Sequence, residues 1–457
     1  MCVGDPSEAV NTVAGLENNE RTEPTVPTNP LTDIGNHVIL VFGDLGTGDH
    51  LRSLLASRSE ERTHWRQLRW LVYVMGLFHL KMACVDAIWR LFIRPVNTRK
   101  GENSLINLIG RIRERETGKF ESKPTFRQMH DATQHIGVGT RLEAWRLLAR
   151  TRGYSSLEAF AAARPTFTQL VEYSEILAST YVAGRTFHAE RRKPDQERDK
   201  HHENMLQMQK IFLLYEELTY AMNTGDIGRL ETVFIPWSAI FFACGKHRYA
   251  NELLRYLKNV YFVYPEGLRR AVRYNILANP TGKSDGFRGI DWMLEHQNLY
   301  IKRIYCGSGS NRTLDHIISQ SPLIEVYKET RREFEEMFDI NHNGTQHSKA
   351  NMERTFLRLT TYMEQYGTVE RIAGRGSTFA LGDLVGSGMN QIYAKFKQGI
   401  DTDTVAPTAV VEGEDLEQDA EANTGDNEDD WGDLIGLFGD DLGDDEEEVE
   451  GVADLEV

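Results

Sequence analysis

Apolar residues recur every three or four positions through most of the chain between residues 81 and 397. This period places them on one face of a helix and therefore predicts a largely helical protein. The expected helices cover residues 82–92, 104–115, 127–149, 166–190, 205–222, 249–262, 289–305, 322–338 and 351–365. Few long runs in this stretch alternate between apolar and polar residues, as half-buried strands do.

Two short runs before this stretch favour β-structure. HVILVFG, from residue 37, and WLVYVMGLFHL, from residue 70, are rich in β-branched and aromatic residues. The first run leads into the glycine-rich segment DLGTGD, which predicts a loop, and the charged residues 57–69 favour a helix. We therefore expect a mostly α fold with a small β-sheet, of the α+β class.

The charge distribution divides the chain into three parts. Residues 400–457 hold 23 acidic residues and no basic one, whereas residues 37–399 hold 51 basic and 39 acidic residues, a net charge of +12. Residues 1–36 are rich in proline, threonine and asparagine and show no apolar periodicity. We therefore expect a disordered leader at 1–36, an α-rich domain at 37–399 and a disordered acidic tail at 400–457.

Composition excludes several classes of protein. The four cysteines lie far apart without a CxxC pair, which argues against a disulfide scaffold or a cysteine-rich zinc site and fits a reducing compartment. The longest uncharged apolar stretch, residues 70–80, has 11 residues, whereas a bilayer span needs about 20. The first thirty residues show no secretory signal, so we expect an intracellular protein without a membrane span.

The segment GDLGTGD, residues 43–49, is the first candidate site. A carboxylate at the end of a strand, beside glycines that leave room for a phosphate, is a suitable arrangement for holding Mg²⁺. Asp44 is the better placed of the two acids, and Asp49 is the second candidate metal ligand. The alternative is a Gly/Asp loop that only ends the strand.

Several further motifs occur in a fixed order. They are FHLKM at residues 78–82, HRYANELL at 247–254, NPTG at 279–282, and Asp291 followed by EHQN at 295–298. Over residues 43–305, and weakly to 366, the chain resembles the fungal domain of unknown function 6589 family. That family has no agreed biochemical activity, but its layout is similar to that of transposon-derived proteins with a ribonuclease-H-like core.

The resemblance implies where a ribonuclease-H-like site would lie. Asp44 would be one metal-binding carboxylate and Glu295 the last, with a large helical insertion at about residues 95–240 between them. His79 would orient a phosphate or a carboxylate. If the site is catalytic, its cofactor would be Mg²⁺ or Mn²⁺, and no other cofactor is indicated.

Asp291 and Glu295 are four residues apart in the expected helix 289–305, so their carboxylates can face the same direction. Two acids on one face can share a divalent ion, and we therefore group Asp291 with Asp44 and Glu295 as catalytic candidates. Alternatively, Asp291 interacts with the helix dipole and Glu295 pairs with a nearby basic residue, Lys302 or Arg303.

Two further observations bear on activity. His247 and Glu252 lie in one of the motifs and are candidate supporting residues, although such a pair is more often structural. A ribonuclease-H-like site takes its first aspartate from the first strand of its sheet, and only 36 residues precede the expected first strand. If Asp44 is the second catalytic position, the first is missing and two-metal phosphoryl transfer should be impaired.

Three functional hypotheses follow. The first is a transposon-derived, nucleic-acid-associated protein, catalytically degenerate, that binds DNA through its basic body and resides in the nucleus. The second is an active metal-dependent nuclease or transposase of the DDE type that uses Asp44, Asp291 and Glu295. The third is a non-enzymatic scaffold whose acidic tail binds a protein partner. The sequence specifies neither an oligomeric state nor a preferred DNA sequence.

The phosphate contacts of the first hypothesis would come from two groups of arginines. They are Arg111, Arg113 and Arg115, and Arg269, Arg270 and Arg273. Such arginines are otherwise ordinary charges on a helix surface, and no DNA-reading motif accompanies them.

Overall fold

The computed structural model describes residues 37–184, 187–295, 313–338 and 352–397. The predicted leader, 1–36, and the predicted acidic tail, 400–457, lie outside these residues. The part described is mostly helical and contains two small sheets, which confirms the predicted fold class. In this part of the chain, every helix is too short or too polar to cross a membrane.

The strands are β1 (Ile39–Gly43), β2 (Leu71–Met75), β3 (Leu277–Ala278) and β4 (Arg288–Gly289). The α-helices are α2 (Leu45–Ser57), α3 (Leu77–Phe92), α4 (Leu105–Ile112), α5 (Thr117–Ser122), α6 (Phe126–Thr151), α7 (Leu157–Ala162), α8 (Phe167–Tyr181), α9 (Phe187–Arg191), α10 (Lys200–Thr224), α11 (Ile227–Ala243), α12 (His247–Lys258), α13 (Glu266–Asn275), α15 (Leu314–Gln320), α16 (Ile324–Met337), α17 (Glu353–Tyr366) and α18 (Leu384–Lys397). Short 3-10 helices are η3 (Val96–Arg99), η4 (Glu114–Glu116) and η6 (Ser321–Leu323), and η5 (Asn259–Val263) is a π-helix. A further helix starts at residue 290, and its residues 290–295 are described.

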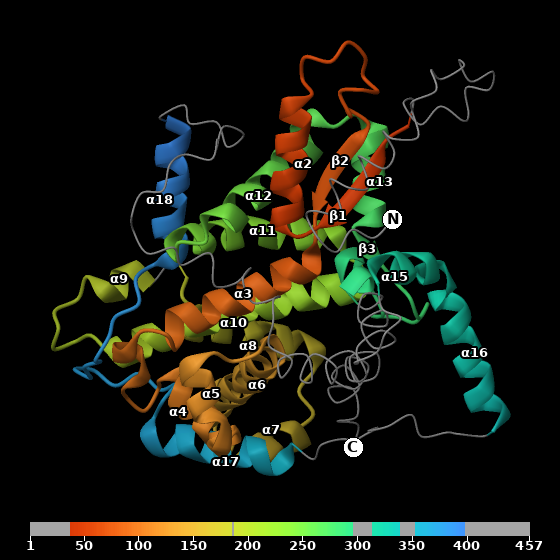
Figure 1. Cartoon of the computed structure of the whole chain (residues 1–457). Helices are drawn as coiled ribbons and strands as arrows, with labels where there is room; N and C mark the ends of the chain where they lie inside the picture. Colours follow the sequence, from red (N-terminus) through yellow and green to blue (C-terminus); the bar gives the residue numbers. More distant parts are fainter. Residues whose placement is uncertain (1–36, 185–186, 296–312, 339–351, 398–457) are drawn as a thin grey trace.

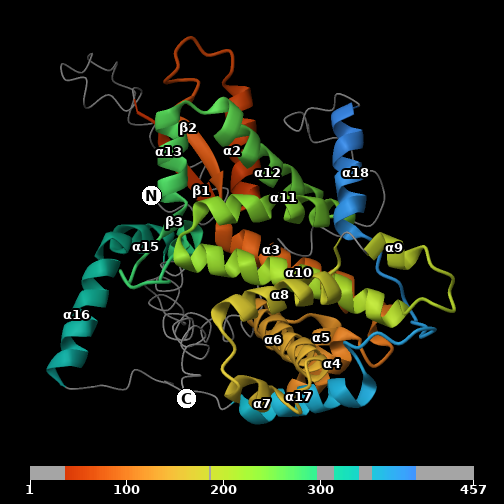
Figure 2. The same ribbon diagram turned by 180° about the vertical axis from the view of Figure 1, so that it is seen from behind.

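The elements lie in three tiers (Figure 1). The strands β1 and β2 lie at one end with α2, α12 and α13, while α3, α10 and α11 cross the middle. The third tier contains α4 to α8 and α17, and α16 projects from one side. Figure 2 shows the same tiers from behind. The small sheet is therefore mounted on one end of a helical body.

The strands β1 and β2 are parallel, with Ile39 opposite Leu71 and Gly43 opposite Met75. Helix α2 connects them, as a crossover between parallel strands requires. Both strands end at the same edge of the sheet, where Asp44 and Gly76 follow them. The strands β3 and β4 pair antiparallel, and the helix from residue 290 starts directly after β4.

Residues 43–49 are not the predicted loop, because α2 starts at Leu45. Asp44 caps the helix, and its Oδ1 accepts a hydrogen bond from Thr47 N at 2.7 Å. Gly48 lies against Tyr73 of β2, and a Cβ at Gly48 would come within 2.6 Å of that ring. Glycines lower helix propensity, which is why the sequence pattern predicted a loop there. The helix predicted at 57–69 is also wrong, since residues 58–70 form mostly turns.

Other predicted boundaries shift where a residue interrupts the helix. The run predicted as a strand from residue 70 ends at Met75, and its remainder, with His79, starts α3 after Gly76. The predicted helix 166–190 divides into α8 and α9 because Val182 has an extended backbone. In the predicted helix 289–305, residue 289 belongs to β4 and residues 296–305 lie outside the described residues.

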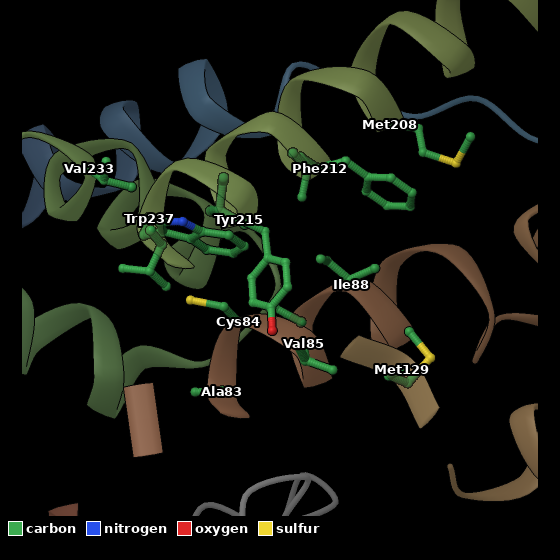
Figure 3. Close-up of a cluster of buried hydrophobic side chains, with 14 of the residues drawn as sticks. Ala83, Cys84, Val85, Ile88, Met129, Met208, Phe212, Tyr215, Val233 and Trp237 are labelled. Carbon is green, nitrogen blue, oxygen red and sulfur yellow. The ribbon is translucent and has the colours of Figure 1, made fainter. Parts of the chain in front are cut away.

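Helix α3 connects the sheet to the helical core. Figure 3 shows Cys84 and Ile88 of α3 beside Phe212 and Tyr215 of α10 and Trp237 of α11. All five residues are at most 1% exposed. Because α3 starts at the end of β2 and continues into this core, the packing fixes the position of its first turn.

Candidate functional site

The carboxyl ends of β1 and β2 form the edge at which the candidate site lies. Gly76 N donates a hydrogen bond to Gly43 O at 2.9 Å, so the residues that follow the two strands stay adjacent. Tyr73 OH donates to the carbonyl oxygens of Gly43 (3.1 Å) and Asp44 (2.6 Å), which ties the start of α2 to β2. In open α/β sheets, ligands bind at this edge.

Asp291 reaches this edge from the helix that starts at residue 290, and its side chain is 1% exposed. Its Oδ1 accepts a hydrogen bond from Phe78 N and its Oδ2 accepts one from His79 N, both at 3.0 Å. These two amides belong to the first turn of α3, whose N-cap residue, Gly76, has no capping side chain. Asp291 therefore caps α3 from a distant part of the sequence and places a negative charge at the positive end of the helix dipole.

Two glycines make room for this carboxylate. A Cβ at Gly76 would lie 2.2 Å from Asp291 Oδ2, and a Cβ at Gly289 would lie 2.6 Å from Asp291 Oδ1. Sequence reasoning did not identify either glycine as part of the site. One indication was present in the sequence: Gly76 precedes the helix at the position where serine, threonine or aspartate usually caps one, so the cap had to come from elsewhere.

His79 is held by the same carboxylate, with its Nδ1 2.9 Å from Asp291 Oδ2. Burial favours the neutral ring, but the hydrogen bond and charge of Asp291, together with the charges of Glu295 and Asp44, raise the pKa of His79 to about 9. The ring is therefore an imidazolium at neutral pH, and Nδ1–H donates to Asp291. Nε2–H is then the donor that could meet a phosphate or carboxylate oxygen of a ligand.

The three acids grouped as catalytic candidates all act on this imidazolium. Asp44 is half-buried, and one of its oxygens caps α2. Glu295 is also half-buried and lies one helical turn after Asp291. The structure thus brings Asp44, Asp291 and Glu295 into the neighbourhood of His79. Because the site contains three carboxyl groups and one positive ring, it would attract a cation more readily than an anion that binds by itself.

The arrangement does not form a ready metal site. In the ranges that the structure describes, no three or more histidine, cysteine, aspartate or glutamate side chains are placed to hold one ion. Asp49, the second predicted metal ligand, uses its Oδ1 on Arg52 and its Oδ2 on Arg248, each at 2.5 Å. Asp49 therefore connects α2 to α12 by ion pairs. Asp44 uses its Oδ1 on Thr47 N, as the cap of α2.

The predicted supporting residues His247 and Glu252 both lie in α12. Glu252 is 5% exposed and pairs with Arg52 at 3.1 Å and with Arg255. The His247 ring packs against Phe242, with 5.5 Å between the ring centroids. Residues five positions apart lie on different faces of a helix. The contacts of Glu252 give it a structural role between α2 and α12.

The predicted phosphate-binding arginines have different surroundings. Arg113 pairs with Asp131 at 2.7 Å, and Arg273 pairs with the buried Glu231 at 2.9 Å, so both are engaged inside the protein. The other predicted contacts are more accessible. Arg269 is partly exposed, and the exposed arginines are Arg111, Arg115 and Arg270. Helices α4 and α13 lie in different tiers in both views (Figures 1 and 2), so the two groups do not form one patch.

The His79–Asp291 pair predicts a pH dependence of stability. The pKa of His79 is about 9 in the folded protein, compared with an ordinary value of 6.5. A group with a raised pKa stabilises the fold fully below pH 6.5, and this contribution is lost as the pH rises through 9. The loss corresponds to about 3 kcal/mol. Urea unfolding between pH 6 and 10 would measure it.

The comparison uses His79→Gln and, as a control, the exposed His50→Gln. The unfolding free energies of wild type and His79→Gln should converge as the pH rises, while the His50→Gln curve should follow wild type. Parallel curves for wild type and His79→Gln would show that another group titrates in this range.

Comparison with known sequences relates the chain to a family of proteins. The sequence model of DUF6589, described as a family of unknown function, matches residues 7–347, a range that includes Asp44, His79, Asp291 and Glu295. Neither the curated proteins nor the solved structures contain a significant match.

Proposed function

We propose that this chain, which belongs to the DUF6589 family, is a nucleic-acid-associated protein of transposon-derived ancestry whose ribonuclease-H-like site is catalytically degenerate. The observation that carries the proposal is the engagement of Asp291. Both of its carboxylate oxygens accept hydrogen bonds from α3 and His79. Binding of a metal ion by Asp291 would compete with these contacts, because a cap and a metal ligand need the same oxygens.

The order of the elements supports the proposed ancestry. Asp44 follows the first of two parallel strands, His79 follows the second, and Glu295 lies in a late helix. This is the order that the resemblance implies for a ribonuclease-H-like site. The sheet that carries Asp44 has two strands within the described residues, which fits a reduced core.

Association with nucleic acid is supported by charge. Residues 37–399 carry a net charge of +12. Arg111, Arg115 and Arg270 are exposed. Contacts of this kind act on the phosphate backbone and release counterions, so they carry little sequence information. A nuclear location would follow from this function.

The proposal predicts a steep dependence of DNA affinity on salt. For three or four phosphate contacts, the association constant should fall about 40-fold to 150-fold between 50 and 200 mM salt. Fluorescence anisotropy with a labelled oligonucleotide and the full chain would measure the slope. Absence of binding at 50 mM salt would overturn the proposal.

The second candidate function is an active metal-dependent nuclease. It is favoured by the charges of Asp44 and Glu295, both of which act on the His79 ring. Mg²⁺ is commonly held by one or two carboxylates together with substrate phosphates, so these two acids could hold an ion when DNA is bound. The ion would stabilise the charge that develops on the phosphate, and His79 could orient a phosphate oxygen.

Cleavage assays with Mg²⁺ or Mn²⁺ separate the two functions. The degenerate site predicts no metal-dependent cleavage by wild type. Cleavage that is lost in both Asp44→Ala and Glu295→Ala, but kept in the exposed control Glu60→Ala, would establish the nuclease. Cleavage that survives both changes would reject the site. The scaffold hypothesis depends on residues 400–457, which lie outside the described residues.

A further inference from the structure

Aromatic side chains are unusually exposed on η5 and α13. Phe262 is 86% exposed, Tyr274 is 75% exposed and Tyr261 is 52% exposed. Large rings gain free energy by burial, so neighbouring exposed rings usually mark a binding surface. We call these three residues, together with Arg269 and Arg270, the η5–α13 surface. Figure 1 shows α13 beside β1 and β2.

A buried acid ties the two elements together. Glu231 of α11 is 2% exposed, and it accepts hydrogen bonds from Tyr261 OH at 2.7 Å and from Arg273 Nη2 at 2.9 Å. Val260 of η5 and Val272 of α13 are both fully buried beneath the surface. The exposed rings are therefore carried on a fixed platform, which lowers the entropy lost when a ligand binds.

The η5–α13 surface is positively charged. Residues 259–275 contain three arginines and one acidic residue. Arg273 is engaged by Glu231, whereas Arg269 and Arg270 form no ion pair within the part of the chain that the structure describes. The Arg270 guanidinium lies 5.9 Å from the centre of the Tyr274 ring. Two available cations thus lie among rings whose faces can stack.

We propose that the η5–α13 surface binds single-stranded nucleic acid, with unpaired bases stacked on Phe262 and Tyr274 and phosphates contacted by Arg269 and Arg270. Exposed rings and arginines together match a strand that presents both base faces and phosphates. A continuous duplex offers its phosphates and the edges of its bases, but not the base faces, because its bases are already stacked on each other. This inference rests on the proposed function and specifies its ligand.

The surface is connected to the candidate site through β3 and β4. Helix α13 ends at Asn275, and Leu277 of β3 pairs with Gly289 of β4. Asp291 follows two residues later. A strand held on α13 would therefore lie in the same tier as the edge that carries Asp44, His79 and Asp291.

The test measures binding of a labelled oligothymidylate and of a duplex by the full chain. Phe262→Ala and Tyr274→Ala should each weaken single-strand binding about tenfold, within the range found for base stacking. Arg269→Gln with Arg270→Gln should lower the salt slope by about 1.4, or 0.7 for each lost contact. Phe262→Trp should retain binding because it keeps a stacking ring.

Matched controls are available elsewhere on the surface. Phe167→Ala removes a ring that is 81% exposed on α8, and Arg150→Gln with Arg152→Gln removes two exposed arginines at the end of α6. Neither control should alter single-strand binding. All these side chains are exposed except Arg269, which is partly exposed, so thermal unfolding of the variants should follow wild type and exclude loss of folding as the cause.

Each other outcome has a distinct meaning. If wild type binds the single strand but the η5–α13 variants bind equally well, this inference fails and the proposed function stands. Equal affinity of wild type for duplex and single strand would also overturn it. If the ring variants change only the sedimentation of the protein, the surface is an interface between copies of the chain. If wild type binds neither ligand at low salt, the proposed function itself fails.

Discussion

Replacement of Asp291 by alanine is expected to lower the free energy of unfolding by about 3–5 kcal/mol, because it removes one partner from a buried charged pair. Two partly buried amides at the start of α3, those of Phe78 and His79, would lose their hydrogen-bond acceptor. The His79 ring would also lose its principal counterion, so its pKa should fall from about 9. Urea unfolding at pH 7 measures the first effect, and an NMR titration of the ring measures the second.

Asp291→Asn distinguishes the effect of the helix cap from the effect of the negative charge. Its amide oxygen can still accept one backbone hydrogen bond, so this variant should lose less stability than Asp291→Ala while still lowering the pKa of His79. The exposed Glu60→Ala serves as the control for loss of an acid. An unchanged unfolding free energy in Asp291→Ala would show that the cap does not stabilise α3.

Local patterns predicted the elements that depend on local interactions. The β-branched runs predicted β1 and β2, although the second run continues beyond β2 into α3, and the three-to-four period predicted most of the long helices. The pattern did not predict α2, because Gly46 and Gly48 oppose a helix on propensity alone. The helix forms because Asp44 caps it and because Gly48 allows contact with Tyr73.

The candidate site was predictable only in part. The resemblance placed Asp44, His79 and Glu295 in one site, and the structure brings them together with Asp291. The sequence could not indicate that Asp291 caps α3, because the amides that Asp291 binds precede it by 212 and 213 residues. The ion pairs of Asp49 with Arg248 and of Arg273 with Glu231 could not be predicted for the same reason, since each pair of residues becomes adjacent only in the folded chain.

Another buried acid, Asp199, connects α10 to the segment before α18. Its Oδ1 accepts hydrogen bonds from His202 N (2.9 Å) and Arg375 Nε (3.0 Å). Its Oδ2 accepts hydrogen bonds from Arg375 Nη2 (2.7 Å) and Ile372 N (2.6 Å). Burial alone would raise the pKa of Asp199, but Arg375 and the two amides hold it below the ordinary value. Asp199 thus caps α10 and fixes residues 372–375 against it.

Asp199→Ala is expected to destabilise the protein by about 3–5 kcal/mol, since it leaves the Arg375 guanidinium without its buried counterion. Arg375→Ala should cost a similar amount, because it also removes hydrogen bonds to Gly367 O and Glu370 O. The double variant should lose clearly less than the sum of the two, with a coupling energy of about 2–3 kcal/mol. Urea unfolding of the four proteins gives this cycle.

The control is an ion pair of the same type on the surface. Glu329 and Arg332 pair on α16 with side chains that are 52% and 65% exposed. Glu329→Ala should change the unfolding free energy by less than about 1 kcal/mol, because solvent screens exposed pairs. If Asp199→Ala and Arg375→Ala proved additive, the two side chains would stabilise the fold independently. Limited proteolysis gives a second measurement of the coupling. If the two residues are coupled through Asp199, both variants should expose the same segment, residues 367–381, to cleavage.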